Sequence, residues 1–92
     1  DEAFFAAQRL VEERLAACAN IHEPVTSVYR WEGAVQQEQE IVLTAKTIEA
    51  LIERAIAMVK SLHSHQLPCI IAYPVTRGFA PFMQWVADET KD

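Results

Sequence analysis

The strongest constraint on the fold is a β-hairpin pattern in the first half of the chain. Residues Val25 to Trp31 are rich in β-branched and aromatic side chains, which favour strands. Glu32-Gly33 is a turn signal, and a second strand follows it, best defined over Ile41 to Lys46. The polar run from Gln36 to Glu40 falls on the second arm of the hairpin, where its charges suit a solvated strand edge.

Amphipathic helices are predicted on both sides of this hairpin. An apolar stripe at three- and four-residue spacing predicts a helix from Asp1 to about Asn20, with Cys18 on its apolar face. A wider stripe between Ile48 and Leu62 predicts a second helix. Further along, the nearly continuous apolar run from Leu67 to Val75 predicts a buried strand, and Pro81 to about Glu89 a short helix.

The predicted order of elements is α-β-β-α-β-α within one domain, residues 1–92. Each amphipathic helix needs a sheet face to bury against. The pattern therefore predicts the α+β class, as a ferredoxin-like (split βαβ) sandwich with an antiparallel sheet. That architecture places a strand before the first helix, and none is visible there, so we expect the first strand to be missing from this chain.

Composition narrows the classes of function. Of the 92 residues 51% are apolar, which excludes intrinsic disorder. The net charge of −5 argues against binding to nucleic acid or to an anionic membrane, because both need a positive surface. No apolar stretch approaches the roughly 20 residues of a membrane span. Two cysteines make no disulfide framework, so we expect a reducing, cytoplasmic location.

Three potential metal ligands, His63, His65 and Cys69, lie within seven residues. Imidazole and thiolate groups bind soft or borderline cations, and His22 is a more distant candidate. The spacing matches no zinc-finger pattern, so a polar loop with solvated histidines is the simpler interpretation. For Cys18, the simpler interpretation is a small buried side chain.

The aromatic residues divide between an interface and the core. Tyr29 and Trp31 lie on the hairpin, away from any expected helix face, and we predict that they form a subunit interface, where Tyr and Trp are enriched. Trp85 is expected to pack in the core. Only two glycines are present, so no phosphate-binding loop is expected.

These segments together resemble the CutA divalent-cation tolerance family. The stretch from Glu13 to Ile21 is similar to the family's first-helix signature, and Ser27 to Gly33 to its hairpin motif. The matching positions further along are Glu40, Leu43, Lys46, Thr47, His63, Pro68, Pro74, Val75, Thr76, Gly78, Phe82 and Trp85. The resemblance implies a ferredoxin-like homotrimer with hairpins paired between subunits, tolerance of copper and other divalent metals, and no enzymatic reaction. Animal members are linked to acetylcholinesterase anchoring.

Departures from the family pattern affect the expected metal site. Only His63 transfers directly, because the usual His-Pro-Tyr-Glu stretch reads His63-Ser64-His65-Gln66 and a usual glutamate after Pro68 is Cys69. These changes replace carboxylates with softer ligands, so we expect copper at His63, His65 and Cys69 rather than calcium or magnesium.

The leading hypothesis is therefore a non-enzymatic, homotrimeric protein of divalent metal binding and tolerance. Two alternatives stay open. One is a PII-like trimeric signalling module that binds a small ligand in the clefts between subunits. The other is a scaffold that presents a surface to an unidentified protein partner. An acyl-phosphate hydrolase ranks last, since the sequence has no glycine-rich anion loop.

Overall fold

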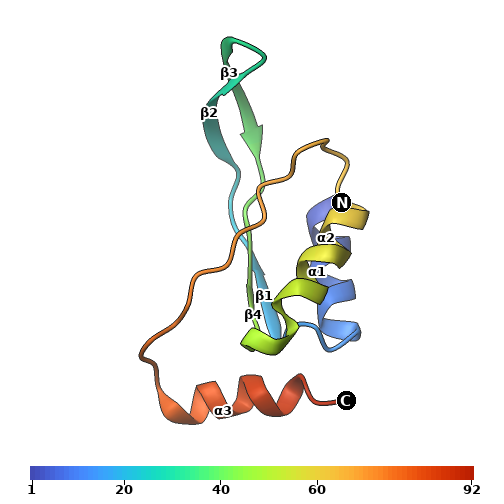
Figure 1. Cartoon of the computed structure of the whole chain (residues 1–92), viewed down its shortest axis with the longest axis vertical. Coiled ribbons are helices and arrows are strands. Elements are labelled where there is room, and N and C mark those ends of the chain that lie inside the picture. The colour runs from blue at the N-terminus through green and yellow to red at the C-terminus, as the bar shows by residue number, and fades with distance from the viewer.

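One long antiparallel hairpin forms the axis of the molecule (Figure 1). The computed structural model describes residues 1–92. Strand β1 (Cys18–Ile21) pairs with β4 (Leu43–Lys46), and β2 (Val25–Trp31) pairs with β3 (Ala34–Glu40), both antiparallel. The predicted hairpin is confirmed, and its second arm includes the polar run as β3.

The two pairs of strands are offset by one residue. Ile21 lies opposite Leu43 at the end of the first pair, whereas Val25 lies opposite Glu40 at the start of the second. Three residues, 22–24, therefore face two, 41–42, which is a β-bulge. The His22 amide still donates to the Val42 carbonyl at 2.9 Å. Pro24 has no amide hydrogen, which explains why the ladder breaks there.

The tip of the hairpin is a two-residue turn with left-handed backbone at both positions. The φ angles are 50° at Glu32 and 82° at Gly33. Positive φ at both central residues is the signature of a type I′ turn, whose twist matches that of the flanking strands. The turn closes the pair Trp31–Ala34 and so fixes the register of β2 against β3.

Helix α1 (Glu2–Glu12) is shorter than predicted. Asp1 caps its start by accepting a hydrogen bond from the Phe4 amide at 2.8 Å. At its end Arg14 adopts a φ of 59°, and the Leu15 amide donates back to the Leu10 carbonyl at 2.9 Å. This is the geometry of a Schellman motif, which stops a helix.

The prediction that this helix extends to Asn20 with Cys18 on its apolar face is therefore wrong. Cys18 is half-buried and begins β1. The spacing of apolar residues continues to Leu15 because this side chain does pack on the apolar side of α1. It does so after the chain has reversed its direction at Arg14, and not as part of the helix. Leu15 is 5% exposed and belongs to the same core as Leu10.

The core lies where α1 and α2 (Ile52–Leu62) meet β1 and β4 (Figure 1). Its fully buried members are Leu10, Leu15, Ala16 and Leu51, the last of which ends the short 3-10 helix η1 (Glu49–Leu51) before α2. Both helices lie on one side of the β1–β4 pair. The predicted α+β class is confirmed, with two antiparallel two-stranded sheets of which the β1–β4 pair packs against helix α1.

The C-terminal helix α3 (Ala80–Glu89) agrees with prediction, and a proline lies in its first turn. The Arg14 guanidinium donates to the Glu89 carbonyl at 3.0 Å and ties the end of α3 to the end of α1. Trp85 is 41% exposed and lies beside Phe82, with ring centroids 5.6 Å apart. The expectation that Trp85 packs in the core is wrong for this chain, since Val86 is the buried apolar residue of α3.

The apolar run from Leu67 to Val75 is not a strand. It belongs to the α2–α3 connection, residues 63–79, which crosses from the end of α2 to α3 without a ladder partner (Figure 1). A strand needs a neighbour that supplies N–H and C=O groups, and Pro68 and Pro74 remove two donors from this run. Most of its large side chains are exposed, with Tyr73 at 81%, and Ile70 is half-buried.

Replacing Leu10 with alanine tests this description of the core. Leu10 is 2% exposed, so the cavity left by Leu10→Ala should lower the free energy of unfolding by about 2–5 kcal/mol. Urea denaturation followed by far-ultraviolet circular dichroism measures it. Val11→Ala on the same helix is the matched control. Its side chain is 41% exposed, so equal losses in the two variants would contradict the packing described.

Candidate metal centre

The two predicted histidine ligands lie side by side in the loop that follows α2. His63 ends the helix with extended backbone. The His63 and His65 rings are edge-to-face, with centroids 4.8 Å apart. The His65 amide donates to His63 Nδ1 at 3.0 Å, so that nitrogen is occupied and Nε2 is the one left to bind a cation.

Glu2 holds this loop against the start of α1. Its carboxylate accepts hydrogen bonds from the Ser64 amide at 2.6 Å and the Ser64 hydroxyl at 3.1 Å. The amide hydrogen bond is the main reason that the pKa of Glu2 is lowered, and the nearby His63 and His65 lower it further. The histidine pair is thus anchored to the N-terminal helix.

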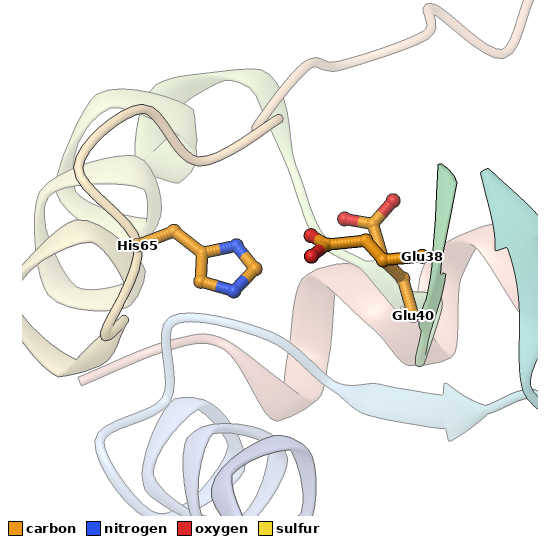
Figure 2. A group of neighbouring side chains, drawn as sticks. All are labelled: Glu38, Glu40 and His65. Carbon is orange, nitrogen blue, oxygen red and sulfur yellow. The ribbon is translucent and has the colours of Figure 1, made fainter. Parts of the chain in front are cut away.

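Cys69, the third predicted ligand, does not join the histidines. It is an exposed free thiol in the unpaired α2–α3 connection. The structure instead brings His65 to two carboxylates, Glu38 and Glu40, with one ligand atom from each of the three residues within 4.8 Å of the others. In Figure 2 the His65 ring points toward the two glutamates of β3. The set His63, His65 and Cys69 stays a prediction.

Sequence reasoning missed Glu38 and Glu40 as partners of His65. The run containing them was interpreted as a solvated strand edge, and β3 is indeed exposed except at half-buried Glu40. One signal was available: glutamates two residues apart on a strand point to the same face. The approach of a loop 25 residues further along has no signature in local sequence.

Tyr29 lies on the same face of the hairpin as the two glutamates. Ser27 is opposite Glu38 and Tyr29 opposite Gln36, so Tyr29 and Glu38 are diagonal neighbours. Desolvation raises the pKa of Tyr29, and its hydrogen bond to Glu38 raises it further. Trp31 lies at the hairpin tip, and both aromatic side chains are half-buried within the single chain.

His22 and Cys18 lie on the hairpin and outside this cluster. His22 Nε2 is 2.8 Å from the Thr44 hydroxyl across the strand pair. Cys18, in β1, lies opposite Lys46 of β4. The donors that converge on the α2 loop are therefore imidazole nitrogen and carboxylate oxygen, with a thiol nearby in sequence. This donor set suits a divalent transition-metal ion better than a phosphate or a nucleotide.

Comparison with known proteins gives a consistent family assignment. The family model of the CutA1 divalent ion tolerance protein matches residues 1–89. The divalent-cation tolerance protein CutA of Thermus thermophilus is 42% identical over 91% of this chain and 82% of its own length. Human protein CutA is 36% identical over 92% of this chain and 48% of its own length, so the chain spans about half of that relative.

Solved structures agree with the sequence relatives. The periplasmic divalent cation tolerance protein CutA of Archaeoglobus fulgidus has a TM-score of 0.94 and 37% identity, covering 98% of this chain and 87% of that one. The PII-like protein CutA of a Nostoc species, in apo form, has a TM-score of 0.90 and 33% identity, covering 98% and 88%. No helix of the present structure is long and apolar enough to cross a membrane.

The contact between Glu2 and Ser64 predicts a pH-dependent contribution to stability. Because folding lowers the pKa of Glu2, ionised Glu2 stabilises the fold above its ordinary value of 4.5, and this stabilisation is lost as pH falls through the lowered pKa. Glu2→Gln should therefore unfold at lower urea concentration than the parent at pH 7, with the difference vanishing in strong acid. Glu53→Gln, on the exposed face of α2, is the control. A deficit that persists unchanged in acid contradicts the assignment.

Proposed function

The chain belongs to the CutA1 divalent ion tolerance family, and we propose that it binds divalent cations, copper foremost, through the loop that follows α2. The observation that carries this proposal is the contact between the His63 and His65 rings in that loop, whose centroids are 4.8 Å apart. Two imidazoles in one loop provide the start of a site for a borderline cation without any rearrangement of the fold.

Cys69 supports copper as the preferred cation. A thiolate is a soft ligand, and imidazole with thiolate is a donor set that copper favours over calcium or magnesium. Cys69 is exposed, and no backbone ladder holds the connection around it. We propose that Cys69 becomes a further ligand of an ion already bound by His63 and His65. The function of the protein in this proposal is cation binding and tolerance in the cytoplasm, without an enzymatic reaction.

The active unit in this proposal is a homotrimer. The chain exposes 7173 Å², whereas a monomer of its 10.4 kDa is expected to expose about 5,400 Å². The excess of about 1,800 Å² is of the order that a permanent interface covers. The radius of gyration, 14.6 Å, also exceeds the roughly 12 Å of a compact domain of this length. We assign Tyr29 and Trp31 to that interface.

A second candidate is a PII-like signalling module that binds a small ligand between subunits. It is favoured by one observation, the high structural similarity to a protein described as PII-like. Thermal-shift measurements with nucleotides and small anions separate it from the first candidate, because a ligand of the folded state raises the melting temperature. A protein-interaction scaffold would respond to neither metal nor metabolite.

Copper titration by calorimetry tests the ligand assignment. The parent chain should bind Cu²⁺, and His63→Ala and Cys69→Ser should each weaken binding by at least about tenfold, since each removes a ligand. His22→Ala is the control, because His22 is on the hairpin beside Thr44. Affinities equal to the parent in both ligand variants would remove His63 and Cys69 from the site.

Native mass spectrometry tests the assembly. We expect a trimer, and Trp31→Ala should shift the population toward monomer by about tenfold or more, as truncation of a central interface aromatic does. Trp85→Ala is the matched control, because that ring packs against Phe82 within α3. A monomeric parent chain at micromolar concentration contradicts the proposed unit.

A further inference from the structure

We propose that Glu38, Glu40 and His65 form a site for a borderline divalent cation of the Zn²⁺ class, which joins β3 to the α2 loop. The proposal rests on the cation-binding function proposed above. It differs in its ligands, since it uses two carboxylates of the hairpin and needs neither His63 nor Cys69 as a ligand.

The geometry places the three ligand atoms within side-chain reach of a common ion. The three ligand atoms lie within 4.8 Å of one another. Nitrogen and oxygen ligands lie about 2.0–2.2 Å from zinc, so two ligands on one tetrahedral ion are about 3.3–3.6 Å apart. The atoms must therefore approach by roughly 1 Å or slightly more, which rotation about the three side-chain bonds of each glutamate can supply. Figure 2 shows the imidazole already directed at the carboxylates.

The charges of the cluster also call for a cation. Glu38 and Glu40 form no ion pair with lysine or arginine, since the two ion pairs of the chain are Arg9–Glu13 and Lys91–Asp88. Two carboxylates on one face of a strand repel each other, and a divalent ion bound between them neutralises both.

Neighbouring groups are placed to orient the members of the cluster. Tyr29 lies diagonally across the strand pair from Glu38, and the His65 backbone amide donates a hydrogen bond to His63 Nδ1 at 3.0 Å. Partners of this kind fix the direction of metal ligands and are a regular part of metal sites. Because it lies on the same face of the hairpin as Glu38, Tyr29 is a positioning residue for that carboxylate.

The donor set indicates the class of ion. Carboxylate oxygens suit hard and borderline cations, and imidazole suits zinc and its neighbours. The absence of a thiolate from the cluster separates it from the proposed copper ligands. With three protein ligands, a tetrahedral ion keeps one position for water. Because copper binds tightest to almost any such set, Zn²⁺ and Co²⁺ are the probes that distinguish this site.

Calorimetric titration with Zn²⁺ is the first test. The double variant Glu38→Gln with Glu40→Gln should bind Zn²⁺ at least about tenfold more weakly than the parent, because it keeps the shape and removes both negative ligands. The control is Glu53→Gln with Glu49→Gln, which removes the same charge from exposed positions at the start of η1 and α2. Equal Zn²⁺ affinity in the parent and the hairpin double variant overturns the proposal.

Co²⁺ spectroscopy separates this proposal from the copper ligands. A Co²⁺ ion bound by oxygen and nitrogen gives visible d–d bands alone, whereas a thiolate ligand adds an intense charge-transfer band. We expect the former spectrum in the parent, its loss in the hairpin double variant, and its retention in Cys69→Ser. A charge-transfer band that disappears in Cys69→Ser would refute the carboxylate site. The two proposals can fail separately. If His63→Ala and Cys69→Ser leave Cu²⁺ affinity unchanged while the hairpin double variant loses Zn²⁺ binding, the proposed copper ligands are wrong and the carboxylate site stands.

Discussion

The pairing of residues 18–31 with 34–46 determines the position of nearly every other feature. A one-residue slip in an antiparallel pair would exchange the two faces of a strand, and here the turn at Glu32-Gly33 fixes the register from one end. That register puts Tyr29, Glu38 and Glu40 on a common face. The bulge at residues 22–24 then shifts the register by one, so that β1 and β4 present their own face to α1. The core and the carboxylate cluster can therefore coexist on one hairpin.

The end of α1 is the second point on which the fold depends. At Arg14 a non-glycine residue takes the left-handed backbone that usually favours glycine, at a cost of about 1 kcal/mol or more. Two features offset it. The reversal places Leu15 and Ala16 in the core, and the Arg14 side chain binds the last carbonyl of α3. A glycine at this position would relieve the backbone and lose the link to Glu89.

Local patterns in the sequence predicted what local forces determine. Alternation and a turn signal gave the hairpin, and period 3.6 gave α2 and α3, because each pattern reflects contacts between near neighbours. The errors occurred where distant groups decide. The spacing of apolar residues as far as Cys18 is compatible with one continuous helix. In the structure the helix ends earlier, because the chain reverses and the Leu15 amide donates to the Leu10 carbonyl. The run at Leu67–Val75 is strand-like in composition, but a ladder depends on a partner edge that local sequence does not specify. For the same reason His63 and His65 were found as a pair, whereas Glu38 and Glu40 were not.

The small core of the single chain bears on the proposed cation site and the proposed assembly. Nine of its 92 residues are buried, so the apolar stabilisation within one chain is small. Any ligand that binds only the folded state adds stability that grows with the logarithm of its concentration relative to the dissociation constant, about 2.7 kcal/mol at 100 times that constant. An ion bound by the β3 glutamates and His65 would join two segments more than 20 residues apart in the sequence. It would thereby hold the start of the α2–α3 connection against the hairpin.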